Sequence, residues 1–338
     1  MMAFDLARAK SVKHAIELLS ANRGAKLIAG GTNLVDLMKE SVETPGMLVD
    51  ITRLPLDTID VITNGGLSIG ALATNSAVAY DAAVQASYPL LSSAILAGAS
   101  PQLRNMASTG GNLLQRTRCY YFYDTATACN KRVPGSGCSA IGGLNRIHAI
   151  LGTSEQCIAT HPSDMCVALA ALDAVVCVAG PRGQRRIAFE EFHRLPGDTP
   201  QIDTNLEPDE IIIAVELPAA NFGNHYAYLK VRDRASYAFA LVSVAAALEL
   251  DGDKIVRARI ALGGVAHKPW RDRVAERSLT GQAVGRAPFE AFATALLQTA
   301  KPQSDNAFKI DLAHRAIVRA LKQATARASQ VQSSKSFQ

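Results

Sequence analysis

The sequence predicts a mixed α+β protein with more than one domain. A chain of 338 residues is longer than a typical single domain. Within the first fifty residues, strand-like and helix-like patterns alternate, which is typical of a small α/β unit. Further on, the strand-like runs "ALVSVAAALEL" and "KIVRARIALGG" flank the turn "DGD" and precede a helical remainder. We therefore expect an N-terminal α/β unit and a second unit of strands followed by helices.

The first fifty residues carry the pattern of the N-terminal unit. In "SVKHAIELL", Val12, Ala15, Ile16 and Leu19 recur at the spacing of one helix face, and Ser11 is a suitable N-cap. The apolar run "AKLIAGG" predicts a short strand that ends in two glycines. After it, "TNLVDLMKE" predicts a second helix and "MLVDI" predicts another buried strand.

The centre of the chain has regular patterns on both sides of an irregular segment. "GLSIGALAT" predicts a strand, and the stretch that follows it is mostly helical with a break at Pro89. Residues 115–160 show no periodicity. After them, "SDMCVALAALDAVVCVAG" predicts a helix and a strand, and "DEIIIAVELP" predicts another strand. A domain boundary is expected at residues 218–225, and the polar tail at residues 329–338 is expected to be disordered.

Composition and charge exclude several classes of protein. Hydrophobic residues make up 48% and charged residues 19%, which suits a globular protein with a core. The net charge of +5 is mild, and no basic face with interleaved aromatic residues indicates nucleic-acid binding. No apolar run reaches the roughly 18 residues of a membrane span. The N-terminus shows no secretory signal, which predicts a cytosolic start and weakens a disulfide interpretation of the six cysteines.

Two glycine-rich stretches indicate an anion-binding site. "KLIAGGTNL" places two glycines between a strand and a helix, and "ASTGGNLLQRT" repeats the pattern of Ser/Thr, Gly-Gly and Asn further on. Glycine lets the backbone approach a ligand closely, and free N–H groups at a helix start favour a pyrophosphate. The first stretch is not the G-x-G-x-x-G dinucleotide motif. A tight turn with an N-cap explains it equally well.

Four cysteines in the irregular segment indicate a metal centre. Their spacing, Cys119-x9-Cys129-x8-Cys138-x18-Cys157, matches neither compact ferredoxin runs nor the CxxC pairs of zinc ribbons. Loops can wrap around an inorganic core, so an iron–sulfur cluster and a zinc ion are both open at this point. Two disulfides are less favoured without a signal peptide. Six basic residues against two acidic ones between residues 101 and 160 would offset the negative charge of a cluster.

Other residues have a structural interpretation beside a functional one. Asp164, in "HPSDM", is either an N-cap or a partner for a cofactor hydroxyl. Lys230 is either a surface lysine at the beginning of a strand or a cation near a cofactor, and Tyr123 either covers the core or contacts an aromatic cofactor. Three further residues are expected to be structural, namely His161, Cys166 and Cys177. We find no Ser-His-Asp pattern, no paired carboxylates and no H-E-x-x-H, so no catalytic residue is predicted.

Five motifs carry a resemblance to a known family. In order, "AGGTNLVDLM", "QLRNMASTGGN", "HPSDM", "DEIIIAVELP" and "ALGGVAHKPWR" resemble the FAD-binding subunit of the molybdenum hydroxylases, from about residue 3 to residue 328. That family includes xanthine dehydrogenase, carbon monoxide dehydrogenase and bacterial aldehyde oxidoreductases. Most members lack the cysteine segment. The segment is similar to the 4-hydroxybenzoyl-CoA reductase type and, more closely, to the FAD subunit of bacterial periplasmic aldehyde oxidoreductase.

The resemblance implies roles for particular residues. It places the first pyrophosphate loop on Lys26, Leu27, Ile28, Ala29, Gly30, Gly31, Thr32, Asn33 and Leu34. It places the second pyrophosphate loop on Ser108, Gly110, Gly111 and Asn112. Contacts with the flavin or with the rest of the cofactor are implied for Tyr123, Asp164, Ile211, Ile212 and Lys230. The implied ligands of a [4Fe–4S] cluster are Cys119, Cys129, Cys138 and Cys157.

The resemblance also implies a domain organisation. A two-lobed FAD-binding domain of the PCMH type is expected over residues 1–220, with the cluster-binding insert at about residues 115–160. A smaller α+β domain, similar to the C-terminal domain of CO dehydrogenase flavoproteins, is expected over residues 221–328. The chain would be the middle subunit of an αβγ heterotrimer. Its partners would be a large subunit with the molybdenum cofactor and a small subunit with [2Fe–2S] clusters.

The implied function is electron transfer in an aldehyde oxidoreductase. Aldehyde oxidation on the large subunit would send electrons through the [2Fe–2S] clusters to FAD and on to an external acceptor. A hydroxybenzoyl-CoA reductase-like or xanthine dehydrogenase-like enzyme is the alternative within the family. A zinc-stabilised nucleotide-binding module and a structural subunit without flavin are rival functions. We expect a periplasmic location through co-export with a signal-bearing partner, with the cytoplasm as the alternative.

Overall fold

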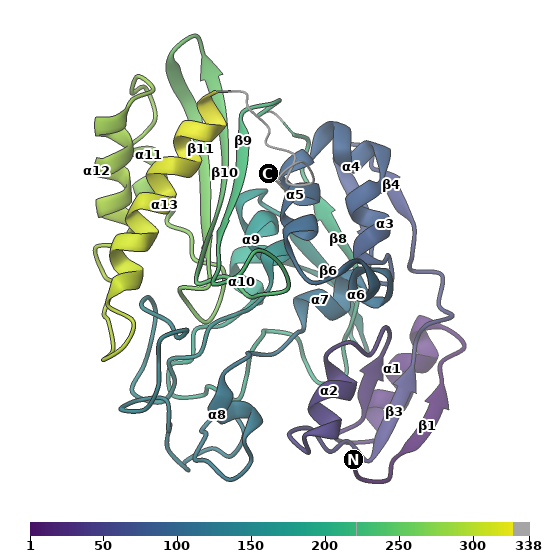
Figure 1. Ribbon diagram of the computed structural model, residues 1–338. Helices are drawn as coiled ribbons and strands as arrows, with labels where there is room; N and C mark the ends of the chain where they lie inside the picture. The colour runs from purple at the N-terminus through teal and green to yellow at the C-terminus, as the bar shows by residue number, and fades with distance from the viewer. Residues whose placement is uncertain (221, 327–338) are drawn as a thin grey trace.

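The computed structural model describes residues 1–220 and 222–326 of the chain. Two lobes lie one above the other, and a third unit of one sheet and three helices lies beside the upper lobe (Figure 1). The cysteine segment lies below the third unit and beside the N-terminal lobe in this view. Among the described residues, no helix is long and apolar enough to span a membrane. The tail predicted to be disordered lies outside the described residues.

The N-terminal lobe is a three-stranded parallel sheet in the order β1-β3-β2. Its elements are β1 (Asp5–Arg8), α1 (Val12–Ala21), β2 (Lys26–Ile28), α2 (Leu34–Lys39) and β3 (Met47–Asp50). The predicted α/β alternation is confirmed, and Ser11 caps α1 by accepting a hydrogen bond from the His14 N–H at 3.1 Å. Parallel strands need crossover connections, which the two helices supply. The first glycine stretch therefore connects the end of β2 to the start of α2.

The second lobe is built on a five-stranded sheet of antiparallel neighbours in the order β4-β5-β8-β6-β7. Its strands are β4 (Ile59–Val61), β5 (Leu67–Gly70), β6 (Val175–Gly180), β7 (Gly183–Ala188) and β8 (Ile211–Leu217). Its helices are α3 (Asn75–Tyr80), α4 (Ala82–Ser87), α5 (Pro89–Ala97), α6 (Pro101–Met106), α7 (Thr109–Leu113), α9 (Asp164–Ala171) and α10 (Phe189–Phe192). Every residue of α9 is buried, because the helix shares one core with this lobe and with the C-terminal sheet.

The predicted helical stretch after β5 breaks where expected and once more. The break at Pro89 is confirmed, since this residue begins α5, a position where proline costs no hydrogen bond. A second break at Asp81 was missed. The Asp81 carboxylate accepts hydrogen bonds from the N–H groups of Ala83 and Val84 at 2.9 and 3.0 Å and so starts α4. An aspartate within a helical pattern resembles a surface residue until its capping contacts are known.

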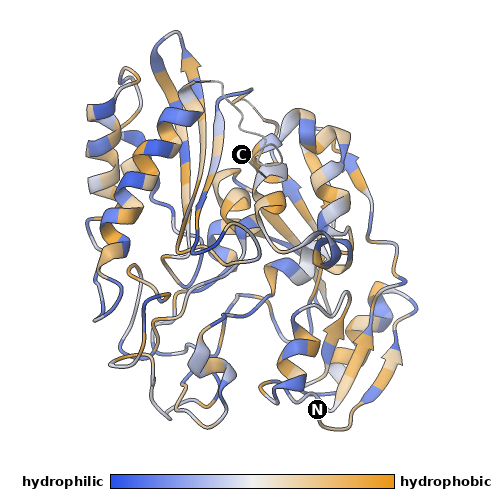
Figure 2. Ribbon diagram, viewed as in Figure 1, coloured by the Kyte–Doolittle hydropathy of each residue, from blue (hydrophilic) through white to orange (hydrophobic). Residues whose placement is uncertain are grey.

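The C-terminal unit is an antiparallel sheet in the order β11-β10-β9 with three helices. Its elements are β9 (Tyr226–Val231), β10 (Val242–Asp251), β11 (Lys254–Gly263), α11 (Arg273–Arg277), α12 (Arg286–Leu296) and α13 (Phe308–Thr325). The predicted turn is confirmed, with Gly252 at a φ of 58° between β10 and β11. Apolar residues of the sheet pack on α12 and α13 on one face and on α9 on the other. Figure 2 shows hydrophilic residues spread along α12 and α13, which cover the sheet from outside.

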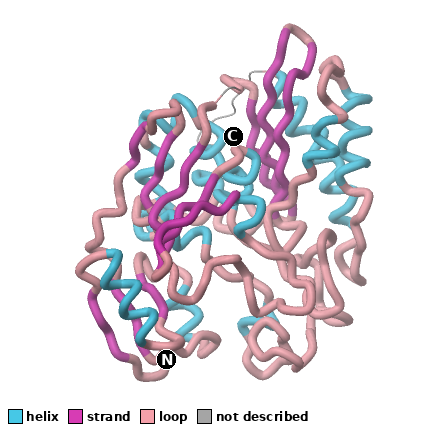
Figure 3. The backbone as a smooth tube through the Cα atoms, turned by 180° about the vertical axis from the view of Figure 1, so that it is seen from behind, coloured by secondary structure: helices cyan, strands magenta, loops and turns pink. Residues whose placement is uncertain are grey.

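The cysteine segment runs between α7 and α9 mostly without regular structure, as Figure 3 shows by its long loops. One helical turn, α8 (Tyr120–Tyr123), corrects the expectation that its first part contains neither helix nor strand. The segment is held against the C-terminal unit. The N–H groups of Ile150 and Leu151 both donate to the Val265 carbonyl, at 2.9 and 3.0 Å. Lys309 Nζ, from α13, donates to the carbonyl of His148 at 2.7 Å.

Candidate functional site

The two glycine stretches lie against each other although they are far apart in the sequence. A Cβ atom added to Gly30 would stand 1.8 Å from the carbonyl oxygen of Met106, just before the second stretch. Only glycine permits this approach of two backbones. Gly31 has a φ of 70°, which also favours glycine, and leads into α2. The tertiary fold thus brings the two predicted loops together where the two lobes meet.

The first glycine stretch presents a row of backbone donors. The N–H groups of residues 30–34 donate to no other described residue. The side chain of Asn33 adds a donor, because its Oδ1 accepts from the Arg116 N–H at 2.9 Å while its buried Nδ2 has no partner among the described residues. Successive free N–H groups form an anion-binding concavity. The first stretch therefore has free backbone donors available for an anion.

The second glycine stretch is held more firmly by its own lobe. The N–H groups of Thr109 and Gly110 donate to carbonyl groups at the end of β5 and just beyond it. Ser108 caps α7, since its hydroxyl oxygen accepts from the Gly111 N–H at 3.2 Å. The hydroxyl of Ser108 and the side-chain NH2 of Asn112 donate to no residue within the described part of the chain. This stretch can therefore donate through side chains, and the first through its backbone.

Asp164 is not the N-cap of α9, as one interpretation of the sequence had it. Ser163 is the cap, and its hydroxyl accepts from the Cys166 N–H at 3.0 Å. Asp164 accepts from the Tyr228 hydroxyl at 2.6 Å and from Lys230 Nζ at 2.7 Å. The side chains of Lys230 and Asp164 are only 2% and 8% exposed. The surface-lysine interpretation is therefore wrong as well, and Lys230 lies one residue before the end of β9, not at its beginning.

The Tyr123 hydroxyl connects the cysteine segment to the helix that follows the first glycine stretch. It accepts from Arg118 at 2.6 Å and donates to Asp36 of α2 at 3.2 Å. Arg118 also donates to Asp36 at 3.1 Å, which closes a triangle of contacts. Burial raises the pKa of Tyr123 above its usual value, so the phenol stays protonated at neutral pH. The position of this predicted flavin-side tyrosine is thus fixed by α2.

The remaining predicted contact residues lie around the junction of the two lobes. Ile211 and Ile212 begin β8, and their buried side chains pack into the cores of the N-terminal and second lobes respectively. Ile212 also lies beside the second glycine stretch, 3.7 Å from a Cβ atom added to Gly110. The first three residues of the predicted first loop form β2, and Leu34 begins α2. Only residues 29–33 of that loop lie outside a helix or strand.

The four predicted cysteine ligands line one cavity together with apolar residues, including Phe122. Cys119 precedes α8, and Cys129 and Cys138 pair across an isolated bridge. Cys138 is half-buried and the other three are buried, and none forms a disulfide. Sequence spacing alone was a weak signal, but the fold gathers all four thiols around one space.

The separation of the four sulfur atoms indicates what can fill the cavity. In the described residues, no three of these sulfurs lie within 4.8 Å of one another. Sulfurs around a single zinc ion would lie about 3.8 Å apart, because each Zn–S bond is about 2.3 Å long. Burial raises the pKa of Cys119 to about 12 and that of Cys157 to about 11, so at neutral pH these thiols lose their protons to water only when a metal centre binds. The four sulfurs are therefore not arranged as the ligands of a single zinc ion.

The excess of basic residues near the cysteines does not form an uncompensated positive field. Four of the six pair with acidic residues from other parts of the chain: Arg116 with Glu43 and Asp203, Arg118 with Asp36, Lys131 with Asp203, and Arg146 with Asp233. The other two, Arg104 and Arg132, donate to backbone carbonyls. The interpretation that this charge offsets a cluster is therefore corrected. A local count of charges could not include acids that lie elsewhere in the sequence.

A histidine that the sequence did not single out contacts one of the cysteines. His148 Nε2 lies 3.0 Å from Cys119 Sγ, and the side chain is buried. Burial, with a smaller contribution from Lys309, lowers the pKa of His148 to about 4 and keeps the ring neutral. Only one ring nitrogen then carries hydrogen, and Nε2–H can donate to a thiolate at this distance. No local pattern marks this contact, because the two residues are brought together only by the loop.

The fold and these loops define a two-lobed nucleotide-cofactor-binding protein. Residues 2–220 match the family model described as the FAD binding domain in molybdopterin dehydrogenase. Residues 226–324 match the CO dehydrogenase flavoprotein C-terminal domain. The chain therefore belongs to the FAD-binding subunits of the molybdenum hydroxylase family, and the predicted family and fold class are confirmed.

Individual relatives are similar along almost the whole chain. The chain is 53% identical over 331 residues to the aldehyde oxidoreductase FAD-binding subunit PaoB of Escherichia coli K12, covering 97% of this chain and 100% of that protein. It is 27% identical to the carbon monoxide dehydrogenase medium chain of Afipia carboxidovorans, covering 96% and 98%. The solved carbon monoxide dehydrogenase of Hydrogenophaga pseudoflava superposes with a TM-score of 0.76 at 27% identity, covering 96% of this chain and 98% of that one.

Proposed function

We propose that this chain is the FAD- and [4Fe–4S]-binding electron-transfer subunit of a molybdenum-dependent aldehyde oxidoreductase. The proposal rests on the similarity of nearly the whole chain to an aldehyde oxidoreductase FAD-binding subunit. In this proposal, a large partner with the molybdenum cofactor oxidises the aldehyde to a carboxylic acid. A small partner holds [2Fe–2S] clusters, and this chain delivers the electrons to an external acceptor.

The flavin cofactor would be held mainly by its diphosphate. The free N–H groups of residues 30–34 and the unpartnered Asn33 Nδ2 supply the donors on one side, and Ser108 and Asn112 supply them on the other. Asp164 already accepts two hydrogen bonds, but a carboxylate has about four acceptor sites, so a cofactor hydroxyl can be added. When bound, FAD supplies the redox chemistry, and the protein sets its position and its electrostatic surroundings.

The cluster would be held by the four thiolates of Cys119, Cys129, Cys138 and Cys157. Their cavity is lined by apolar side chains such as Phe122 and by polar ones such as Asn130 and Lys131. His148 Nε2–H would donate to the Cys119 sulfur, and hydrogen bonds to cluster sulfurs are one determinant of reduction potential. A bound cluster supplies one-electron chemistry. The contacts of Tyr123 with Arg118 and Asp36 support the further idea that the segment orders the loop on the flavin side.

The visible spectrum of the purified chain tests this proposal against its two rivals. A flavin gives two resolved bands, an iron–sulfur cluster gives broad brown absorbance, and a zinc-stabilised nucleotide-binding module gives neither. Iron and acid-labile sulfide analysis should then find about four of each per chain, as a [4Fe–4S] cluster requires. A colourless chain would rule out the whole proposal. A flavin band without iron would support FAD binding and rule out the cluster.

Single substitutions test the ligand assignment. Each of the four Cys→Ser changes at the cavity should abolish iron binding, because a serine hydroxyl replaces a thiolate ligand. Cys177→Ser provides the matched control, since Cys177 is also buried but lies in β6 away from the cavity. Zinc in place of iron, or loss of iron in the Cys177 variant, would contradict the assignment.

For the location, we propose the periplasm, reached in the folded state with a partner that carries a twin-arginine signal. The cytoplasm is the alternative. The proposal is supported by the resemblance of the cysteine segment to that of periplasmic aldehyde oxidoreductases. Sequencing the N-termini of the co-purified partners decides between the two. If no partner precursor has a twin-arginine signal, the periplasmic proposal fails.

A further inference from the structure

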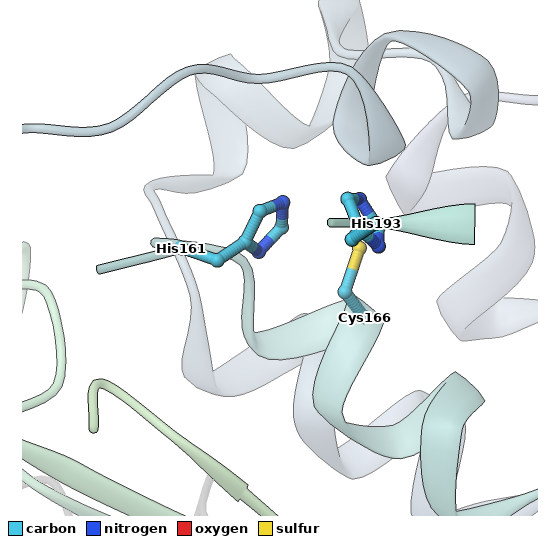
Figure 4. A group of neighbouring side chains, drawn as sticks. All are labelled: His161, Cys166 and His193. Carbon is cyan, nitrogen blue, oxygen red and sulfur yellow. The ribbon is translucent and has the colours of Figure 1, made fainter. Parts of the chain in front are cut away.

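A second group of metal-binding side chains lies beside the second glycine stretch, apart from the four-cysteine cavity. His161, Cys166 and His193 each offer one ligand atom, and these atoms lie within 4.8 Å of one another. Figure 4 shows the two imidazole rings and the thiol gathered together. His161 comes from the loop before α9, Cys166 from α9 and His193 from the residue after α10. No other His, Cys, Asp or Glu trio in the described residues has this spacing.

The hydrogen-bond partners of His193 leave one of its nitrogens available to a ligand. Nε2 lies 2.8 Å from the carbonyl oxygen of Leu113. A carbonyl oxygen only accepts, so Nε2 carries the hydrogen and Nδ1 presents a lone pair. Nδ1 is buried and has no partner among the described residues, and the whole residue is 3% exposed. Metal-binding histidines have this arrangement, in which the second ring nitrogen donates to a backbone carbonyl.

Hydrogen bonding within the protein occupies only one nitrogen of His161, because its Nδ1 accepts from the Ser163 N–H at 3.4 Å. Nε2 of His161 is also buried without a partner in the described part of the chain. The two rings pack edge to face, with their centroids 4.4 Å apart, and the buried Cys166 thiol lies beside them. Two unpartnered buried nitrogens beside a buried thiol are unfavourable unless a water or an ion joins them. A metal ion would satisfy all three groups once the ring hydrogen of His161 moves from Nε2 to Nδ1, which gives up the 3.4 Å contact with the Ser163 N–H.

We propose that His161, Cys166 and His193 bind one zinc ion per chain, separate from the ligands of the proposed iron–sulfur cluster. Two imidazoles and one thiolate form a ligand set that suits zinc. Zn–N bonds of about 2.0 Å and a Zn–S bond of about 2.3 Å need ligand atoms about 3.3–3.6 Å apart, so the trio closes by at most about 1.5 Å on binding. The Cys166 thiol loses its proton to water as the Zn–S bond forms.

This ion would fasten the second glycine stretch to the core of the second lobe. Three segments meet at the trio: the loop before α9, α9 itself and the end of α10. Two hydrogen bonds extend the connection to the glycine stretch, one from His193 to Leu113 at the end of α7 and one from Ser163 to Asn112. The role is structural, and it is independent of the electron-transfer function proposed above.

Metal analysis of the full chain, purified with its flavin, tests the zinc site. After incubation with zinc chloride and desalting, the wild type should retain about one zinc per chain, and Cys166→Ala and His161→Ala should retain at least tenfold less. Cys177→Ala is the matched control, because it removes another buried thiol, and it should keep the zinc. Unchanged iron and flavin contents show that a variant has folded. His161→Ala provides a second test at a less buried position, in case Cys166→Ala fails to fold.

X-ray absorption at the zinc edge gives a second readout that a structural packing role would not produce. It should show one sulfur at about 2.3 Å and nitrogen neighbours at about 2.0 Å. Wild-type protein without zinc, or Cys166→Ala protein with as much zinc as the wild type, would overturn the proposal. It would also be overturned if zinc binding were lost in the variants of the four-cysteine cavity and retained in those of the trio.

Discussion

The proposed flavin region and the proposed cluster site in the cysteine segment are built in opposite ways. In the flavin region, the donors are mainly backbone N–H groups, positioned by a strand and a helix of the N-terminal lobe and by the close approach of Gly30 to Met106. In the cysteine segment, the ligands are side chains on a chain that is mostly irregular. That chain is held by ion pairs with acidic residues of other segments, such as Asp36 and Asp203.

The two sites should therefore be sensitive to different changes in sequence and in pH. A backbone site on regular elements is preformed, so it should depend on side-chain volume at the glycines and on single donors such as Asn33. A side-chain site held by ion pairs should depend on pH and on the distant acids that fix its loops. The flavin region also contains one buried ion pair, between Asp164 and Lys230. The stability lost when this pair is broken can be compared with the stability lost when a pair of the cysteine segment is broken.

The largest effect is expected from Asp164→Ala. This change leaves the ammonium of Lys230 buried without a carboxylate, which costs about 3–5 kcal/mol of folding free energy. The melting temperature of the full chain should fall by about 6 °C or more. Ser163→Ala, which removes the N-cap of the same helix and the hydrogen bond to Asn112, should cost about 1–2 kcal/mol. Equal melting temperatures for the two variants, at equal flavin content, would show that the buried pair contributes no more than a cap.

The second prediction concerns Asp203, which pairs with Arg116 and Lys131 of the cysteine segment. Asp203→Asn should lower the free energy of unfolding by about 3 kcal/mol at pH 7, the low end for a buried pair, because Asp203 is partly exposed. Burial by itself would raise the pKa of Asp203, but Lys131 and Arg116 hold it well below its usual value of about 3.9. The stabilisation is therefore complete above about pH 4 and is lost as the pH falls further.

Unfolding of the full chain at several pH values between 7 and 3 checks this second prediction. The wild type should lose stability below pH 4 more steeply than Asp203→Asn. The control is Asp233→Asn, which removes a pair with Arg146 that is half exposed on both sides and should change stability by less than about 1 kcal/mol. Parallel pH profiles for the wild type and Asp203→Asn would mean that Asp203 does not anchor the segment electrostatically.

In the flavin region, Asn33→Asp should weaken FAD binding by about 1.5–3 kcal/mol, or about 10- to 100-fold. The aspartate keeps the oxygen that accepts from the Arg116 N–H but replaces the free NH2 with a negatively charged oxygen. Titration of the flavin-free chain with FAD, followed by flavin fluorescence, measures the change. An unaltered affinity would show that the diphosphate does not lie at the first glycine stretch.

A glycine substitution is the complementary control for that experiment. Gly30→Ala should lose FAD and also destabilise the flavin-free chain, because the new Cβ atom meets the Met106 carbonyl at 1.8 Å. Asn33→Asp should leave the stability of the flavin-free chain unchanged. The pair of variants therefore separates the loss of a donor from the loss of the loop itself.

The smallest effect is expected on the reduction potential of the proposed cluster. His148→Phe removes the donor to Cys119, and since such hydrogen bonds stabilise the more negative reduced state, the potential should fall. If the hydrogen bond stabilises the reduced cluster by about 1.4 kcal/mol more than the oxidised one, its loss lowers the one-electron reduction potential by about 59 mV. A redox titration followed by electron paramagnetic resonance measures the shift at unchanged iron content. His225→Gln, in the C-terminal unit, is the control, and a potential equal to that of the wild type in His148→Phe would contradict the prediction.

Local patterns predicted much of the architecture and part of the site. The alternation in the N-terminal lobe, the break at Pro89 and the turn at Gly252 all depend on periodicity or on residues with special backbone preferences. The two glycine stretches were recognised for the same reason, and the structure brings them together. Asp81 was missed because an aspartate in a helical pattern can be a cap or a surface residue, and only its contacts distinguish the two.

The sequence by itself determined the family, the succession of helices and strands, the two glycine stretches and the identity of the four clustered cysteines. Tertiary structure alone decided which groups are paired: Asp164 with Lys230, the basic residues of the cysteine segment with distant acids, and His161 with Cys166 and His193. The physical reason is that secondary structure follows from local burial patterns and backbone preferences. The partner of a charge or of a ligand atom depends on which distant segments the core packs together.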